Sequence, residues 1–413
     1  MRRLRAAALT LLLAATTLTG CGEESAGSVV VVIGPWVDDA KKPGEEADVF
    51  AQLLDAYETT LDGVDIQYQG TRAIGQVVQG KIKDGTLPDV AIMPNVGELA
   101  GYATEELARP VTSLVAGSRP PAAGPVVVDH RALWRGDQAY AVAIKTDLKS
   151  LLIFAPDHIG PPPATLEQMA AIPPGSWCLG LSEPSAPGWP GTDWVEDLLL
   201  HRAGRDNYQA WASGDLKWTS DAVRAAFREF RENYVAGPAT LLASPTEAAS
   251  DLVNGHRCTA MHQSSFYAQG GSVPYQMPRS EPGVEVSGDF AARFTANPAA
   301  ETLLKDLTDP GSALARDWVA RSRGMVFPLT PQPELYTGDR RRVANLFTAG
   351  ARCMDASDAM PPAMASAFQN AILEYVADPA PAKLTEVLGR LQKVQAAVSK
   401  DEKLEVYCST GAA

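Results

Sequence analysis

The sequence predicts an α/β protein folded as two lobes. Two observations support this prediction: the length of 413 residues, and apolar runs that alternate with amphipathic segments along the chain. A single hydrophobic core rarely serves a chain of this length, so two lobes are the default expectation. Strands that alternate with helices favour a parallel sheet with helices on both of its faces.

The first part of the chain supplies the clearest alternation. A run of β-branched residues at 29–33 ends at Gly34-Pro35, which is typical of a strand buried on both faces. Apolar residues of the 47–60 segment follow helical spacing, as in an amphipathic helix. By the same criteria, the expected strands are 29–33, 64–69, 88–93 and 139–144, and the expected helices are 47–60 and 74–83. A second apolar segment follows at 151–154.

The later part of the chain is mainly helical in pattern. Thr165 is the expected N-cap of a helix at 166–171, and Ser220 that of a helix at 220–234. Trp189 falls in a loop rich in Gly and Pro, and Trp194 begins a helix. The other expected helices are 194–202, 208–212, 299–308, 312–322, 340–349, 364–376 and 384–399, and the expected strands are 258–266 and 284–286, the first running into a turn.

The charge of the chain excludes one class of partner. The formal net charge is −13, and charged residues make up 21% of the sequence. Nucleic-acid phosphates require a basic face, so we expect no nucleic-acid partner. An acidic chain also gains nothing electrostatically from an anionic membrane surface.

The N-terminal segment is typical of an export signal that ends in a lipid-attachment site. Three arginines precede an apolar stretch, and residues 18–21 read Leu-Thr-Gly-Cys. We therefore expect residues 1–20 to be a signal peptide, Cys21 to carry acyl chains on the outer face of the cell membrane, and 21–28 to form a flexible tether. The alternative is a chance cysteine after a secretory signal.

The four other cysteines are Cys178, Cys258, Cys353 and Cys408. An even number outside the membrane predicts two disulfides, and four cysteines allow three connectivities. A zinc site competes with this interpretation. However, there is no Cys-x-x-Cys pair, and no histidine lies at ligand spacing with two cysteines, so we expect neither a metal nor a cofactor.

Candidate binding residues follow three of the predicted strands. Trp36, Arg72 and Asn95 come directly after the strands at 29–33, 64–69 and 88–93. Ligands of parallel sheets bind beyond the carboxyl ends of the strands, so these side chains are expected to converge on a small-molecule cleft. The alternatives are a core position for Trp36, a surface ion pair for Arg72 and a turn role for Asn95.

Several motifs resemble the extracellular solute-binding proteins of ABC importers, within them the sugar-binding cluster, and most of all its α-glucoside branch. The segments that carry this resemblance, in chain order, are 68–72 (YQGTR), 88–92 (PDVAI), 140–149 (YAVAIKTDLK), 188–194 (GWPGTDW), 258–263 (CTAMHQ), 287–289 (SGD) and 355–361 (DASDAMP). Two departures leave the solute open: residues 267–286 are short and rich in Gly and Pro, and aromatic residues are only 7% of the chain.

The resemblance implies a two-lobed periplasmic-binding-protein-like fold with a hinge and an interlobe cleft. One lobe would comprise 29–145 and 287–327, and the other 146–286 and 328–413. Pairing Cys178 with Cys258 and Cys353 with Cys408 then keeps each disulfide inside one lobe. The implied protein is a monomer, not an enzyme, that captures an oligosaccharide or α-glucoside and delivers it to ABC permease subunits.

The matching motifs supply further candidates for solute contact. Aromatic faces suit the C–H surfaces of a sugar, and planar polar groups suit its hydroxyls. Each candidate has a structural alternative: a hinge role for Lys145, a structural role for His262, and a helix cap for Asp355. The candidates from these motifs are Lys145, Trp189, His262, Gln263, Gly288, Asp289 and Asp355.

Two other functions stay open at this point. A secreted carbohydrate-active hydrolase needs only two carboxylates, although no Gly-x-Ser-x-Gly, P-loop or His-Glu-x-x-His motif occurs. A solute-sensing lipoprotein with a protein partner would share the same fold.

Overall fold

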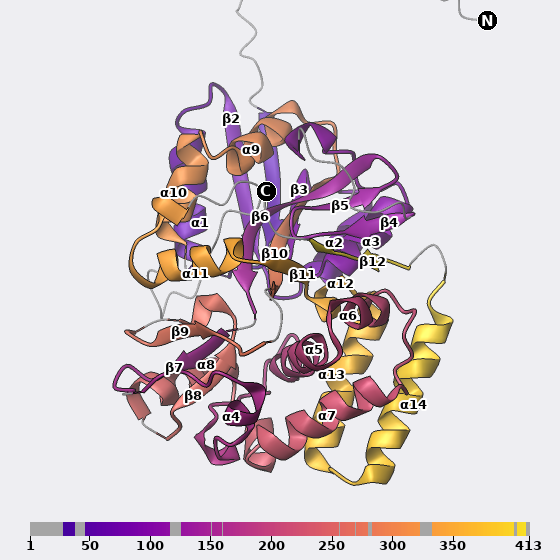
Figure 1. Cartoon of the computed structure of the whole chain (residues 1–413). Helices are drawn as coiled ribbons and strands as arrows, with labels where there is room; N and C mark the ends of the chain where they lie inside the picture. Colours follow the sequence, from indigo (N-terminus) through magenta and orange to yellow (C-terminus); the bar gives the residue numbers. More distant parts are fainter. Residues whose placement is uncertain are drawn as a thin grey trace, which may run out of the picture.

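The computed structural model describes residues 28–37, 46–115, 125–149, 151–158, 160–255, 257–268, 270–279, 283–322, 333–399 and 403–409. The predicted signal peptide, Cys21 and residues 22–27 of the tether lie outside the described residues. Figure 1 shows an upper lobe built on a large sheet and a lower lobe that is mostly helical.

The large sheet begins with three parallel strands, as the sequence pattern predicts. Strands β1 (Ser28–Gly34) and β2 (Val64–Gly70) pair in register along their whole length, and β3 (Val90–Met93) pairs with the other edge of β1. The sheet as a whole is mixed, because β10 (Gly283–Arg293) joins β3 in the antiparallel sense. The chain returns from the second lobe as β10, and this strand therefore runs opposite to its neighbour β3.

The remaining strands of the large sheet extend it on the far side of β10. The order across the sheet is β12-β4-β5-β6-β10-β3-β1-β2, and β11 pairs with both β10 and β13. Their bounds are β4 Val126–Val128, β5 Ala132–Arg135, β6 Gln138–Leu148, β11 Ala351–Met354, β12 Glu405–Val406 and β13 Cys408–Ser409.

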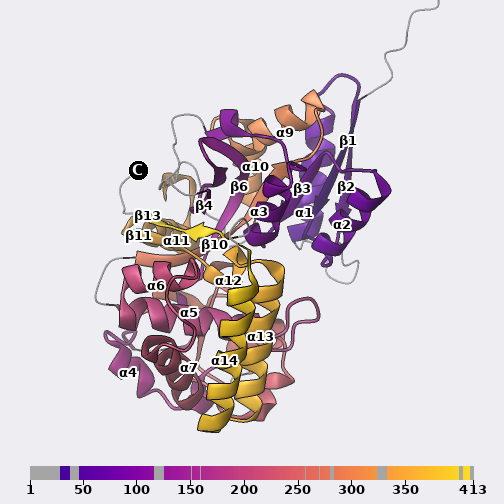
Figure 2. The same ribbon diagram turned by 90° about the vertical axis from the view of Figure 1, so that its right-hand side faces the viewer.

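Helices cover both faces of this sheet, which Figures 1 and 2 show from two sides. One hydrophobic core lies under α1, α9 and α10, and another lies under α2 and α3. The bounds are α1 Glu46–Glu58, α2 Ile74–Asp84, α3 Val96–Thr104, α9 Pro298–Thr308 and α10 Ala313–Arg321.

The second lobe combines a small antiparallel sheet with a group of helices. The sheet has the order β8-β7-β9, formed by Leu151–Phe154 (β7), Ala260–Gln263 (β8) and Val273–Gln276 (β9). The helices are α4 Leu166–Ala170, α5 Trp189–Ala203, α6 Arg205–Ala212, α7 Asp221–Asn233, α8 Pro245–Ser250, α13 Pro362–Ala377 and α14 Pro381–Ala397. The short helix α12 (Ala356–Ala359) and helix α11 (Gly338–Thr348) lie where the lobes meet (Figure 1).

The predicted helix caps are present. The Thr165 hydroxyl accepts a hydrogen bond from the backbone N–H of Gln168, and the Ser220 hydroxyl accepts one from Val223. Trp194 is buried in the core of the second lobe.

Among the segments that differ from the sequence-based expectation, two carry the candidate residues Trp189 and Asp289. Helix α5 begins at Trp189, not at Trp194, because Pro190 is compatible with a first helical turn and Gly188 adopts a left-handed φ of 95° before it. Trp189 is therefore half-buried at a helix start and not in a surface loop. Strand β10 continues through Ser287, Gly288 and Asp289, where we expected the strand to stop.

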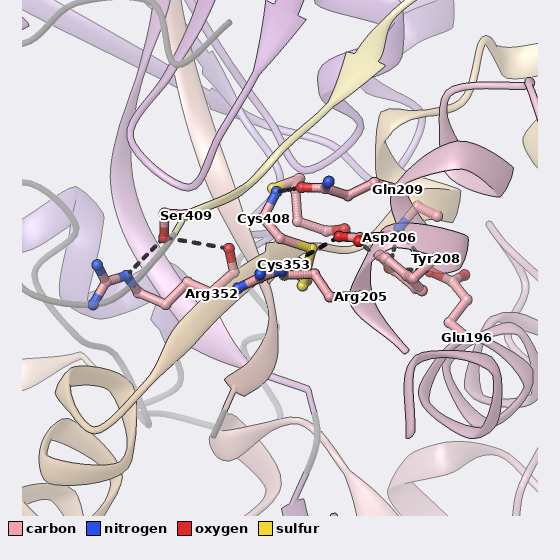
Figure 3. Close-up of a disulfide and its surroundings, with 11 residues drawn as sticks. Glu196, Arg205, Asp206, Tyr208, Gln209, Arg352, Cys353, Cys408 and Ser409 are labelled. Atoms are coloured by element: carbon pink, nitrogen blue, oxygen red, sulfur yellow. Dashed lines mark hydrogen bonds and ion pairs between the residues drawn. A yellow bond between two sulfur atoms is a disulfide. The ribbon is translucent and has the colours of Figure 1, made fainter. Parts of the chain in front are cut away.

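Both predicted disulfides are present, Cys178–Cys258 and Cys353–Cys408. The first joins Cys178, which lies between α4 and α5, to Cys258, which precedes β8. The second joins β11 to β13 and so fixes the C-terminal tail (Figure 3).

The C-terminal tail contacts both lobes. Residues Glu405 and Val406 pair with β4 of the large sheet, whereas the Cys408 N–H donates to the Gln209 side chain of α6 at 2.6 Å. Arg352 also donates to the Ser409 hydroxyl at 3.2 Å (Figure 3). The predicted partition places 328–413 in the second lobe, whereas β11, β12 and β13 pair within the large sheet; the partition into lobes otherwise stays a prediction.

Candidate functional site

The three candidates at the strand ends have different environments. Trp36 is buried, with its ring centroid 4.6 Å from that of Phe50 and 5.1 Å from that of Trp318. Asn95 is half-buried and caps α3, since its side chain accepts a hydrogen bond from the Glu98 N–H at 2.9 Å. These contacts account for Trp36 and Asn95 without a ligand.

Arg72 is the exposed member of this group. Its charge acts on Tyr267 of the second lobe: burial raises the pKa of the Tyr267 phenol, and Arg72 is among the groups that oppose the rise. The charge of Arg72, which follows β2 of the large sheet, therefore reaches Tyr267 of the second lobe.

Buried charges lie on two neighbouring strands at the same boundary. Asp289 of β10 is the register partner of Lys145 on β6, and the Lys145 ammonium lies 3.8 Å from the Asp289 carboxylate and 3.2 Å from that of Asp147. The Gly288 position keeps this pair of strands close, because a Cβ there would lie 2.4 Å from the Lys145 carbonyl oxygen. Gly288 therefore allows the backbone of β10 to approach the backbone of β6 closely.

The second lobe meets these charges with an aromatic face, by which we mean Trp189, Phe266 and Tyr267. The centroid of Trp189 lies 6.5 Å from those of Phe266 and Tyr267, which are 4.7 Å apart. The Lys145 ammonium lies 5.4 Å from the centre of the Phe266 ring. Charged groups of the first lobe and rings of the second therefore come together.

A hydrogen bond ties the aromatic face to the strand that crosses between the lobes. Ser265, which precedes Phe266, accepts from the backbone N–H of Leu148 at 3.2 Å. Its hydroxyl also donates to the Asp147 carboxylate at 3.5 Å. The loop that carries Phe266 and Tyr267 is thus held against the end of β6.

Beneath the aromatic face lies the Lys149 cluster, defined here as Lys149, Asp193, Glu196, Glu285, Asp355 and Asp358. The Lys149 ammonium lies 3.0 Å from the Asp193 carboxylate and 3.0 Å from that of Asp355. Asp355, predicted as a ligand contact or a cap, is fully buried and caps α12 by accepting from the Asp358 N–H at 2.9 Å.

Burial and the surplus of acids over bases shift the pKa values of the Lys149 cluster. Burial alone lowers the pKa of the Lys149 ammonium, but the charges of Asp193 and Asp355 raise it well above its usual value. Burial raises the pKa of Asp193 to about 7, although Lys149 opposes the rise. Burial also raises the pKa of Glu196 and of Glu285 well above the usual range.

One group of carboxylates in the cluster is compact enough to surround a cation. Oxygens of Glu196, Glu285 and Asp355 lie within 4.8 Å of one another. However, Glu196 already accepts hydrogen bonds from the backbone N–H groups of Ala356 and Ser357, and Asp355 is paired with Lys149. We therefore assign no metal to this group.

His262 and Gln263 are buried inside the second lobe. The His262 Nε2 lies 2.5 Å from the Asp197 carboxylate, and its ring centroid lies 4.3 Å from that of Trp194. The Gln263 side chain accepts from the next backbone N–H, that of Ser264. Burial raises the pKa of Asp197, but hydrogen bonds from His201 and His262 outweigh it and hold the pKa below its usual value.

Sequence reasoning missed Lys149, Asp193, Phe266 and Tyr267. Lys149 and Asp193 lie inside two of the motifs on which the resemblance was based, where only their neighbours were singled out. The adjacent aromatic pair Phe266-Tyr267 at the end of the predicted strand and turn at 258–266 was the available signal for the other two.

A two-lobed α/β fold, with charged and aromatic side chains gathered where its lobes meet, is the architecture of a solute-binding protein. No family model matches the chain. The α-glucosides-binding periplasmic protein AglE of Rhizobium meliloti (strain 1021) is 27% identical over 401 residues, which cover 86% of this chain and 85% of AglE.

Two further comparisons agree with this class. The osmoprotective compounds-binding protein GgtB of Synechocystis sp. (strain ATCC 27184 / PCC 6803 / Kazusa) is 26% identical over 435 residues, covering 93% of this chain and 97% of GgtB. The structure of the bacterial solute receptor AcbH matches the fold with a TM-score of 0.69 at 17% identity, covering 89% of this chain and 98% of AcbH.

The chain is therefore a homologue of the solute-binding proteins of ABC importers. The resemblance drawn from its motifs is confirmed, and so is the two-lobed α/β fold class. By name, both sequence relatives are binding proteins. Among the described residues, no helix has both the length and the apolar character needed to cross a membrane.

Proposed function

We propose that the chain captures an α-glucoside or related oligosaccharide between its lobes and delivers it, chemically unchanged, to the permease subunits of an ABC importer. The observation that carries the proposal is the 27% identity to an α-glucosides-binding protein over most of both chains. A solute that contacts both lobes stabilises their closed arrangement.

The chemistry of the lobe boundary supports this ligand class. Trp189 and Tyr267 offer ring faces to the apolar side of a sugar, and Arg72 and Asp289 offer polar groups to its hydroxyls. The rings come from the second lobe and the polar groups from the first. Trp36, Asn95, His262 and Gln263 have the structural contacts given above, so the proposal does not rest on them.

A thermal-shift screen of the chain without residues 1–20 tests this function. We expect maltose or another α-linked glucoside to raise the melting temperature, because a ligand at 100 times its Kd stabilises the folded state by about 2.7 kcal/mol. Cellobiose, the β-linked isomer of maltose, is the matched control. A screen in which no α-glucoside raises the melting temperature contradicts the proposed ligand class.

A second ligand class is favoured by the similarity to GgtB, whose name refers to osmoprotective compounds. Trehalose, sucrose and glycine betaine therefore belong in the screen. A shift with glycine betaine and none with any sugar favours this second class. Release of p-nitrophenol from an aryl α-glucoside by the purified chain instead indicates a hydrolase.

We further propose that the chain works outside the cytoplasmic membrane as a monomer, held there by lipid on Cys21. The sequence signals at residues 1–21 and the periplasmic location in the name of AglE support this proposal. Acyl chains anchor a protein through their buried CH₂ groups, so the Cys21→Ser variant should move from the membrane fraction to the soluble fraction. Equal membrane retention of variant and parent contradicts the anchor.

A further inference from the structure

The backbone of Lys149 is fixed at the point where the chain passes from β6 of the first lobe to β7 of the second. Its N–H donates to the Glu285 carbonyl of β10 at 2.9 Å, and its carbonyl accepts from the Leu151 N–H at 2.8 Å. The side chain of Lys149 therefore starts from a position that is defined relative to both sheets.

The Lys149 ammonium reaches three elements from this position. It lies 3.0 Å from Asp193 on α5, 3.0 Å from Asp355 at the start of α12, and 4.8 Å from the centre of the Trp189 ring. Only 7% of the Lys149 side chain is exposed. Buried cations near an aromatic face are held more strongly than exposed ones, because less water competes for them.

Trp189 and Asp193 lie one helical turn apart on α5, so they present the same side of that helix to Lys149. The Trp189 ring has the Lys149 ammonium as one neighbour and the Tyr267 ring, at an interplanar angle of 20°, as another. The half-buried Trp189 ring therefore contacts both the buried cation and the aromatic face.

We propose that Lys149 is a positioning residue for solute binding, which holds the Trp189 ring in its binding orientation relative to the crossover between the lobes. This inference rests on the proposed function, in which Trp189 contacts the solute. Lys149 itself does not touch the solute. Loss of its ammonium should weaken binding about threefold to thirtyfold, the range that cation–π contacts span from exposed to desolvated sites.

The variant K149M alone would mix two effects, because it also leaves Asp193 and Asp355 without their buried cation. The double variant K149M/D355N keeps the net charge of the cluster. The D355N change is expected to preserve the cap of α12, since an asparagine side-chain oxygen can accept from the Asp358 N–H as the aspartate does. The single variant D355N is the matched control, because it loses the same carboxylate but keeps the Lys149 ammonium, and the double variant is compared with it.

The first test needs no solute. In a chain labelled with 5-fluorotryptophan, the 19F spectrum contains one resonance for each of the eight tryptophans, and W189F identifies that of Trp189. We expect K149M/D355N to shift or broaden the Trp189 resonance and to leave that of Trp36 in place. An unchanged Trp189 resonance overturns the inference, whatever the chain binds.

The second test is calorimetric titration with maltose. K149M/D355N should bind more weakly than D355N, and the same change made in the W189A variant should have less than about a twofold effect, because the ring is then absent. An undiminished effect in W189A overturns the inference. A parent chain that binds neither maltose nor another sugar contradicts the proposed function instead, and leaves the fluorine result to decide the role of Lys149.

Discussion

Removal of the Cys353–Cys408 disulfide should release the C-terminal tail from the large sheet. The tail enters from α14 of the second lobe, and its two strands, β12 and β13, have only two residues each. Such short strands hold weakly without other support. The disulfide to β11 is the covalent end point that keeps them paired.

The magnitude follows from the loop that each disulfide closes. The separations are 55 residues for Cys353–Cys408 and 80 residues for Cys178–Cys258. On the chain-entropy model each disulfide stabilises the fold by about 4 kcal/mol, and the two differ by only about 0.3 kcal/mol. The variants C353S/C408S and C178S/C258S should therefore lose similar free energies of unfolding in guanidinium titrations.

Hydrogen exchange separates the two variants. In C353S/C408S the amides of residues 403–409, such as the Tyr407 N–H that donates to Val128, should lose protection. In C178S/C258S the same amides should keep the protection of the parent, apart from the general loss of stability. Equal protection of 403–409 in both variants would refute the claim that the Cys353–Cys408 disulfide holds the tail on the large sheet.

Three other predictions concern single positions. W189A should lower solute affinity by one to two orders of magnitude in calorimetry, since a stacked ring contributes about 1–3 kcal/mol. The pKa of Asp193 is raised to about 7, so between about pH 4 and pH 7 the folded chain holds a proton that the unfolded chain has released. The free energy of unfolding should therefore fall as the pH rises through this window. The variant D193N should flatten this fall in urea titrations. G288A should cost about 1–3 kcal/mol, because its Cβ would meet the Lys145 carbonyl, whereas G101A on α3 has open space and should be near neutral.

Each of these predictions has a distinct contrary result. Parent affinity in W189A would remove this ring from the solute site. A D193N variant that keeps the full pH dependence of the parent would assign that dependence to other acids. Equal stabilities of G288A and G101A would show that β6 and β10 can separate at Gly288 without cost.

The parts of the fold that depend on local pattern were predictable from the sequence. The β-branched run at 29–33 forms β1, and Thr165 and Ser220 cap helices as expected. The disulfide pairing followed from the resemblance and was confirmed.

The parts that depend on tertiary packing were not predictable in the same way. The density of Gly and Pro around Trp189 suggests a loop, yet Pro190 occupies a helical first turn, and only the fold decides between the two. Strand β10 passes through Gly288 because β6 lies against it, which no local pattern reveals. The mixed character of the large sheet has the same origin.

The candidate site shows the same division. Trp36 follows a strand end as a cleft residue would, but Phe50 and Trp318 bury it from elements distant in sequence. Conversely, no local pattern singles out Lys149, and its importance comes from two carboxylates and a ring that the fold brings to it.

The central claim is that a solute is held by both lobes at once. Calorimetric titration of the strongest sugar from the screen into the parent, R72A and W189A tests it most directly, because Arg72 is an exposed residue of the first lobe and Trp189 belongs to the second. We predict saturable binding by the parent, weaker binding by both variants, and recovery of the sugar unchanged. Parent affinity in R72A or W189A, or a sugar altered by the protein, would contradict the account.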